Sequence, residues 1–302
     1  MRTLVLSVVL LAAALAEPAL AQMGMGGRLG GRYALGEDLT GLSYTEQDPS
    51  AVRSPEPGQG GTLQSQEARV FALVPVAGRG SDTVWSAGLS AEHLSLRFAG
   101  FAPALRPALI PELYGVALNG TVFHRMDEDH SWLAYVAGGR FSDSWPTEGP
   151  GRASAGGIYE VRATPTTTLG VGGGFTYVFG APRAVPILAL AYRDGPWSAN
   201  VRFPFRADAR YAVSDWVRVG AEAFVQGGEF NVTDSPAVDT VRYTAQRVGA
   251  LVSIGRPAGP QLQFDAGQTL YRHYTALDNR DTVLSLGFKD APFYRAGLAW
   301  RW

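Results

Sequence analysis

The chain has 302 residues, of which 46% are hydrophobic and 18% are charged, and its formal net charge is -1. A globular protein usually carries a larger charged fraction, about a quarter, and this near-neutral balance provides no basic surface for nucleic acid. The sequence contains no cysteine, so the fold cannot depend on disulfide bonds. We therefore expect no nucleic-acid partner and no disulfide framework.

The first 21 residues are typical of a secretory signal peptide. Arg2 gives a positive start, residues 4–16 form a short apolar run, and the small residues Ala19 and Ala21 precede the expected cleavage point before Gln22. The alternative for this segment is a buried N-terminal helix. We predict a signal peptide over residues 1–21 and a flexible N-terminal lead over 22–37. No later apolar run reaches the roughly 18 residues of a transmembrane helix.

Downstream of residue 60 the dominant hydrophobic period is 2, which is typical of strands with two different faces. The clearest example runs from Thr168 to Phe179, where Leu, Val, Gly, Phe, Tyr and Phe occupy alternate positions. No segment predicts a helix of convincing length. In chain order, the predicted strands cover residues 38–46, 63–76, 83–98, 113–124, 132–141, 157–163, 168–179, 185–193, 197–213, 216–226, 241–254, 261–272, 282–288 and 294–302, of which 38–46 and 282–288 are the weakest.

In two of these segments the alternation allows more than one arrangement of strands or contains an irregularity. Residues 197–213 keep one parity throughout, which predicts either one long strand with a bulge at Pro204 or two strands joined by a turn that conserves parity. In residues 83–98 the apolar positions change phase, and a bulge near Glu92 and His93 would reconcile the two halves.

The connections between the predicted strands are of two kinds. Tight turns lie at 193–196 and 214–216, whereas long polar or Gly/Pro-rich connections cover 48–62, 142–156, 231–240 and 273–281. A soluble β-sandwich or β-helix is one explanation. The other is an all-β transmembrane antiparallel up-and-down β-barrel over residues 38–302, because lipid-facing aromatic and small residues alternate with charged positions. We favour the barrel, with about 12 strands and with 10 or 14 as alternatives, in the outer membrane of a Gram-negative bacterium.

The C-terminal segment "RAGLAWRW" supports this location. It places a polar residue at Arg295, a glycine at Gly297 and aromatic residues at Trp300 and Trp302. It resembles the β-signal, the last strand of bacterial outer-membrane proteins that the barrel-assembly machinery recognises, although that signal usually ends in Phe. The resemblance implies two partners, outer-membrane lipid and the assembly machinery. It leaves the oligomeric state open.

The middle of the chain carries a second resemblance. Pro186, Tyr192, Trp197, the pair Phe203-Pro204 and Tyr211 follow a pattern similar to that of a family of bacterial outer-membrane β-barrels of unknown function. The resemblance implies a location and a fold. It implies no activity and no catalytic residues.

The main candidates for a functional role are charged residues that the alternation of the strands places inside the barrel. If they line a water-filled pore, they set ion selectivity, and the excess of arginine predicts a mild preference for anions. If they form Arg–carboxylate pairs, they fill a non-conducting lumen. We therefore expect a porin-like passive channel for small solutes or, alternatively, a non-conducting structural or surface-interaction barrel. The predicted lumen-lining residues are Glu67, Arg69, Arg140, Glu160, Arg162, Arg202, Arg206, Asp208, Arg210, Arg218, Glu222, Arg247 and Asp265.

Other candidate motifs give weaker predictions. The run "HRMDEDHS" at 124–131 holds two histidines and three acids, but a polar turn between strands explains it, and a surface cation site is the alternative. No nucleophile–histidine pair stands out, so we expect no enzymatic activity, no cofactor and no metal site, with an outer-membrane hydrolase as a remote third interpretation. Gly170, Gly172 and Gly174 share one face of a strand and predict space in the lumen for an inserted loop or for bulky side chains.

Overall fold

The computed structural model of the chain describes residues 40–301, apart from 54–58, 79–80 and 257–258. The predicted signal peptide, the N-terminal lead and Trp302 lie outside the described residues. Within this range the only helix is the short 3-10 helix η1, Pro103–Ala108. Among these residues there is also no helix of the length and apolar character needed to cross a membrane.

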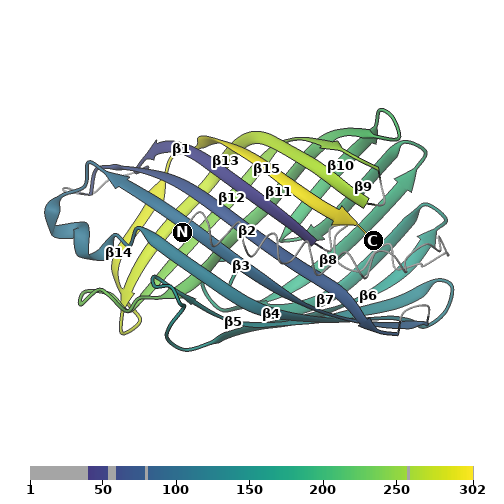
Figure 1. Ribbon diagram of the computed structural model, residues 1–302, viewed down its shortest axis with the longest axis horizontal. Coiled ribbons are helices and arrows are strands. Elements are labelled where there is room, and N and C mark those ends of the chain that lie inside the picture. The colour runs from purple at the N-terminus through teal and green to yellow at the C-terminus, as the bar shows by residue number, and fades with distance from the viewer. Residues whose placement is uncertain (1–39, 54–58, 79–80, 257–258, 302) are drawn as a thin grey trace.

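Fourteen strands close into an antiparallel β-barrel, and one further strand, β14, lies outside the ring (Figure 1). The ring closes where Thr40 of β1 pairs with Trp300 of β15, and β14 pairs with the end of β13 that β15 does not reach. The strands are β1 Thr40–Ala51, β2 Thr62–Ala77, β3 Thr83–Ala99, β4 Glu112–Arg125, β5 His130–Ser142, β6 Arg152–Thr164, β7 Thr167–Thr176, β8 Arg183–Asp194, β9 Trp197–Phe203, β10 Arg206–Ala212, β11 Val217–Asn231, β12 Thr240–Ile254, β13 Gly259–Asp278, β14 Asp281–Phe288 and β15 Ala291–Arg301.

The expected number of 12 strands is therefore wrong, and the alternative of 14 is confirmed. One additional strand comes from residues 197–213, which form a hairpin: Arg202 pairs with Arg206 across a turn centred on Pro204. These two residues differ by four, so the turn conserves parity. The first predicted strand, residues 38–46, corresponds to β1, which pairs with both β15 and β2 and is a full member of the ring.

Two further details differ from the expectations. β3 has no register shift at Glu92 or His93 with either neighbour, so the predicted bulge is absent. The apolar positions change phase because Trp85 and Leu89 face outward, whereas Leu94 faces an apolar interior. The long connection expected at 273–281 is also mostly strand, since β13 extends to Asp278 and only a short turn precedes β14.

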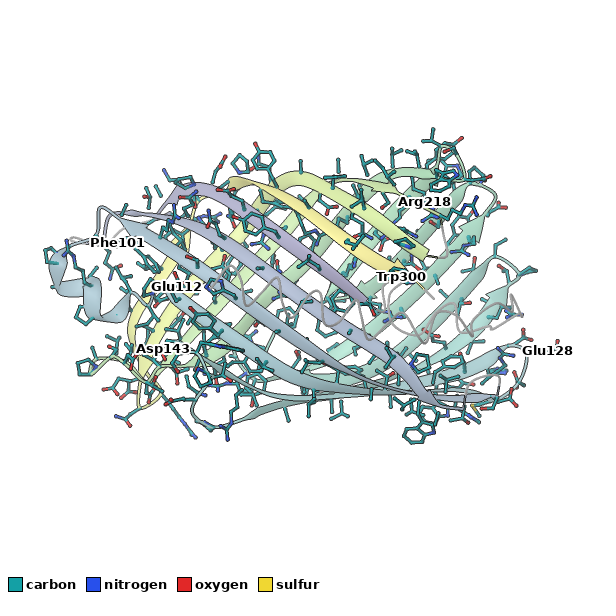
Figure 2. All side chains as sticks on the ribbon, in the orientation of Figure 1. Phe101, Glu112, Glu128, Asp143, Arg218 and Trp300 are labelled. Carbon is teal, nitrogen blue, oxygen red and sulfur yellow. The ribbon has the colours of Figure 1, made fainter. Side chains whose placement is uncertain are left out.

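The two ends of the barrel differ in their connections. At one end, which we name the turn end, short turns follow β4, β6, β8 and β10. At the other, the loop end, longer segments include η1 and residues 143–151 and 232–239. Figure 2 shows the two ends on opposite sides of the molecule, with Phe101 and Asp143 at the loop end and Glu128 at the turn end.

The outward face of the barrel is apolar. Leu118 is 70% exposed and Val76 is 61% exposed, although both are aliphatic. Exposed aromatic residues gather on the outward face beside the turn end, as in the aromatic girdle of an outer-membrane barrel. They are Trp85, Tyr159, Tyr192, Trp197, Tyr211 and Trp216.

Inside the loop end, apolar side chains form a buried cluster that we name the loop-end core. It combines inward-facing residues of β2–β4 with those of β11–β14, so it spans the interior from one wall to the other. Residues beside η1 cover it from the loop end. Its buried members are Val52, Leu63, Leu94, Leu96, Ala108, Leu109, Ile110, Leu113, Phe230, Val232, Val238, Val241, Tyr243, Ala245, Tyr274, Ala276, Leu284, Leu286 and Phe288.

Tyr274 attaches the η1 segment to this core. The backbone N–H of Ile110 donates to the Tyr274 hydroxyl over 2.9 Å, and the hydroxyl donates to the carbonyl of Ala108 over 2.8 Å. Tyr274→Phe leaves both backbone groups without this partner, so we expect the free energy of unfolding to fall by about 1–3 kcal/mol. Chymotrypsin should then cleave after Phe101 faster than in the wild type.

Tyr294→Phe is the matched control for this prediction, because Tyr294 lies on the outward face of β15. Its effect on stability should stay within about 0.5 kcal/mol. Equal losses of stability in the two variants, measured by urea unfolding, would contradict the attachment.

Candidate functional site in the barrel lumen

The first group of predicted lumen charges joins opposite parts of the barrel wall. Glu67 on β2 forms ion pairs with Arg69 and, over 3.4 Å, with Arg247 on β12. Gln226 on β11 donates to Glu67 and accepts from Arg247, and Arg69 pairs with Glu92 on β3 over 2.8 Å. Arg247 is only 2% exposed. This crossing cluster, Glu67, Arg69, Glu92, Gln226 and Arg247, therefore occupies the lumen between β2–β3 and β11–β12.

A second group, the seam cluster, lies near the junction of β15 with β1. Glu222 on β11 is paired with both Arg206, over 3.0 Å, and Arg295 on β15. Arg295 also pairs with Asp265 on β13 over 2.6 Å. On β10, Asp208 lies 3.0 Å from Arg210 and 3.6 Å from Arg206. The Glu222 side chain is fully buried by these contacts. The seam cluster consists of Arg206, Asp208, Arg210, Glu222, Asp265 and Arg295.

The remaining predicted lumen residues lie in different surroundings. Glu160 is buried and interacts electrostatically with Arg202. Arg218 donates to Gln261 over 3.4 Å. Arg162 is exposed beside the turn end.

Arg140 does not line the lumen. It is exposed and pairs in register with Val116, on the face of β5 opposite the buried Leu133. The expected inward position of Arg140 is therefore wrong. Its strand is nearly free of other charges, so the sequence offered little to fix which face points inward.

Three lumen charges are missing from the sequence prediction: Glu92, Arg272 and Arg295, the last of which was predicted only as part of the assembly signal. Glu92 lies beside the predicted bulge and was not among the predicted lumen residues, but β3 keeps its register there and Glu92 pairs with Arg69. Arg272 has the opposite parity to Asp265, but a register shift opposite Gln246 and Arg247 turns it inward, where it is 1% exposed. Arg272 donates to Ser50, to Ser65 over 3.3 Å and to the carbonyl of Leu63 over 2.5 Å.

At the loop end, the ring is narrowed by contact between β5 and β11, which stand six strands apart along the sheet order. Ser142 and Asn231 are Cα partners in a parallel bridge, and the backbone N–H of Asp143 donates to the carbonyl of Asn231 over 3.0 Å. On the other face of β11, Arg152 of β6 pairs with Glu229 over 3.0 Å. β11 therefore lies between the loop-end core and this ion pair.

The glycines of β7 make room for side chains from neighbouring strands. A Cβ on Gly174 would lie 2.7 Å from the hydroxyl oxygen of Tyr135, and one on Gly170 would lie 2.9 Å from Ile158 Cγ2. The sequence prediction allowed for an inserted loop or for bulky side chains from a facing strand, whereas these side chains come from β5 and β6 on the same wall. The wall of β5–β7 is thus lined by side chains that lie close against the sheet.

The histidines at 124–131 are part of a polar turn. His124 Nδ1 lies 2.8 Å from Thr83 Oγ1, and His130 Nδ1 lies 2.8 Å from Asp127 Oδ1. A hydrogen bond from the backbone N–H of Asp129, followed by the contact with His130, lowers the pKa of the Asp127 carboxyl. The two histidines have separate partners, and no group of three or more His, Cys, Asp or Glu side chains that could hold a metal ion occurs among the described residues.

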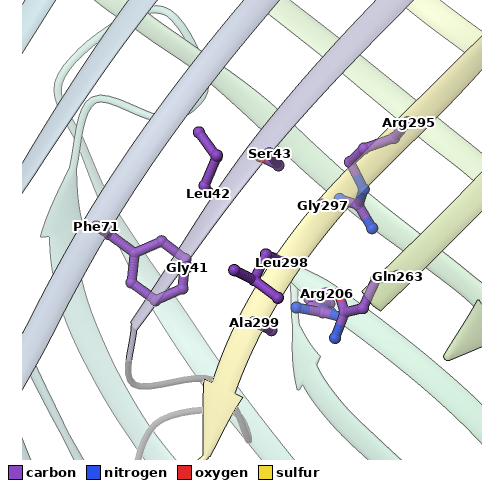
Figure 3. Close-up of a pocket in the computed structure, with 10 residues that line it drawn as sticks. All are labelled: Gly41, Leu42, Ser43, Phe71, Arg206, Gln263, Arg295, Gly297, Leu298 and Ala299. Atoms are coloured by element: carbon purple, nitrogen blue, oxygen red, sulfur yellow. The ribbon is translucent and has the colours of Figure 1, made fainter. Parts of the chain in front are cut away.

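A cavity of about 240 Å³ lies in the lumen beside the seam between β1 and β15 (Figure 3). Of the predicted assembly-signal residues, Arg295 and Gly297 line this cavity, and Trp300 lies beside it on β15. Trp302 lies outside the described residues. The lining residues are Gly41, Leu42, Ser43, Phe71, Arg206, Gln263, Arg295, Gly297, Leu298 and Ala299.

Comparison with known proteins identifies a family and a set of similar folds. The family model described as Domain of unknown function (DUF6268) matches residues 66–301. No curated protein matches the chain. Among solved structures, the chain is similar to the translocator domain of the autotransporter NalP from Neisseria meningitidis, with 12% identity and a TM-score of 0.39 over 100% of this chain and 98% of that one.

Two further solved structures are similar at the same low level. One is an outer membrane channel from Pseudomonas putida F1, with 12% identity and a TM-score of 0.41 over 90% of this chain and 98% of that one. The other is a Pseudomonas aeruginosa FadL homologue, with 11% identity and a TM-score of 0.44 over 87% of this chain and 89% of that one.

Proposed function

We propose that this chain, which belongs to the DUF6268 family, is an outer-membrane β-barrel that does not act as an open porin. Its resting state would be closed to passive passage along the barrel axis. The observation that carries the proposal is the pair of buried layers that cross the interior, the crossing cluster and the loop-end core. A barrel of this kind would serve as a structural or surface-interaction protein, with its loop end presented to partners.

The energetics of the crossing cluster support a closed state. Arg247 and Glu67 are both buried, and buried charges are stable only when paired and hydrogen bonded. Opening a water-filled path between β2 and β12 would separate this pair. It would also expose the loop-end core, which excludes ions because it is apolar.

The outward face supports insertion in a membrane. A soluble protein rarely exposes a continuous apolar surface, and a closed barrel satisfies every backbone hydrogen bond of a sheet in lipid. The girdle of tryptophan and tyrosine beside the turn end fits a membrane–water interface. Short turns lie on the periplasmic side of bacterial barrels, so we orient the loop end toward the outside.

A second candidate function is a channel that opens only after rearrangement. The observation that favours it is the asymmetry of the lumen wall, since inward positions midway along β4, β5 and β7 carry small or uncharged residues such as Ala117, Asn119, Ala137 and Gly172, whereas Arg125, on the same face of β4 as Phe123, lies beside the turn end. Small solutes would pass along this wall if β11 moved away from β5.

Planar-bilayer recording of the purified full chain tests the proposal. We expect no sustained discrete conductance at any voltage that the membrane tolerates. Insertion is established separately, by flotation with liposomes and by a faster-migrating folded band in unboiled gel samples. Steps that are open at all voltages would overturn the closed barrel, whereas openings confined to high voltage would support the second candidate.

A further inference from the structure

The cavity at the β1–β15 seam has features that closure of the barrel does not require. Its two charged lining residues are both arginines, Arg206 and Arg295, and no carboxylate lines it. We propose that this cavity binds a small organic anion, with its carboxylate at the two guanidinium groups and its apolar body against Phe71. The inference goes beyond the proposed function and is independent of whether the barrel conducts.

Buried acids hold the two arginines in place from behind. Glu222 contacts Arg206 through one carboxylate oxygen and Arg295 through the other, and Asp265 contacts Arg295 Nε over 2.6 Å. Neither acid lines the cavity. Figure 3 shows the side chains of Arg206 and Arg295 directed toward the same space beside Gln263. A planar guanidinium matches a carboxylate in geometry and charge, so two positioned groups are suited to one such anion.

The opposite side of the cavity is apolar and flat. The Phe71 ring lies against the backbone of Gly41, since a Cβ on Gly41 would be 2.8 Å from Phe71 Cε1. Gly297 and Ala299 contribute almost no side-chain volume. A volume of about 240 Å³ accommodates a small ring or a short aliphatic chain rather than a larger molecule. A small aromatic carboxylate therefore matches the shape, the apolar surface and the charge together.

The position of the cavity gives such a ligand a route of entry. Gly41 and Ala299 each lie one residue from the Thr40–Trp300 pair, at the turn end of the barrel. On the proposed orientation this end faces the periplasm, so the ligand would enter from there. The loop-end core lies at the other end of the barrel and does not block this approach.

Binding of benzoate to the folded full chain in detergent tests the site, measured by calorimetry or by saturation-transfer NMR. We expect benzoate to bind, and benzyl alcohol and inorganic phosphate to bind at least about 10-fold more weakly, since each lacks one of the two recognised features. If benzyl alcohol binds as tightly as benzoate, the charged site is wrong. If inorganic phosphate binds as tightly as benzoate, the apolar wall has no role in binding. Either result overturns the proposal.

Two variants locate the binding. Arg206→Gln should weaken benzoate binding by roughly 10- to 100-fold, because it removes a charged hydrogen-bond donor. Arg202→Gln is the matched control, because Arg202 on β9 pairs in register with Arg206 on β10 but does not line the cavity. Its affinity should match the wild type. Equal affinity in the two variants overturns the proposal, and the folded gel band confirms that both variants form barrels.

Discussion

Oxidation of a Ser142→Cys/Asn231→Cys variant should join β5 to β11 by a disulfide bond. The two residues are Cα partners in the structure, although their strands stand six apart along the sheet. In a round barrel these positions would lie on distant walls, so the crosslink tests the narrowing of the loop end directly. The natural chain has no cysteine, and the engineered pair would therefore be the only thiols.

The expected effect of this crosslink is large. Positions 142 and 231 are 89 residues apart in sequence, and closing a loop of that length stabilises the folded state by up to about 4.5 kcal/mol in the chain-entropy model. The readouts are loss of reaction with a thiol reagent and a higher urea midpoint than that of the reduced sample.

An Ala137→Cys/Asn231→Cys variant provides the control. Ala137 lies five residues before Ser142 on β5, which places it about 16 Å away along the strand. A disulfide joins Cα atoms no more than about 6.8 Å apart, so this pair should stay reduced. Equal crosslinking of the two pairs would mean that β5 and β11 meet only through large motions, and the closed loop end would then be wrong.

Alternation was sufficient to predict the barrel but not its interior. A period of 2 identifies two faces, and in β7 the exposed Leu169 and Val171 alternate with Gly170 and Gly172 as expected. Period alone cannot show that the apolar face changes sides along one strand. In β3 it does, because Leu89 faces outward whereas Leu94 enters the loop-end core. The change of phase was visible in the sequence, but it was attributed to a bulge.

The lumen charges were predictable where a strand keeps its register and carries several of them. β10 is such a case, since Arg206, Asp208 and Arg210 share one face. The pairs themselves were not predictable. Glu67 and Arg247 are 180 residues apart and meet only because the interior is narrow enough for their side chains to span it. Similarly, Ser142 and Asn231 are 89 residues apart and meet only through the arrangement of the whole barrel, which no local pattern records.

The proposed closure of the lumen depends on the crossing cluster, and the proposed anion binding depends on the neighbouring seam cluster. The crossing cluster fills the space between β2 and β12, whereas the seam cluster leaves a cavity because Gly41, Gly297 and Ala299 face it. The acids of the seam cluster therefore have a structural role and also set the positions of the two arginines. This makes Glu222 the residue whose loss should affect the molecule most.

Glu222→Gln should lower the free energy of unfolding by roughly 3–5 kcal/mol, because it leaves buried guanidinium charge without its partner. The Glu222 side chain is fully buried between Arg206 and Arg295, and glutamine keeps its shape while removing its charge. Urea unfolding in lipid vesicles measures the loss, and adding Arg206→Gln should recover part of it. Glu46 accepts weak hydrogen bonds from Gln64, over 3.4 Å, and from Gln66, over 3.3 Å, so Glu46→Gln should change stability by no more than about 0.5 kcal/mol. Similar losses at Glu222 and Glu46 would show that the seam cluster contributes no more to stability than an ordinary surface charge.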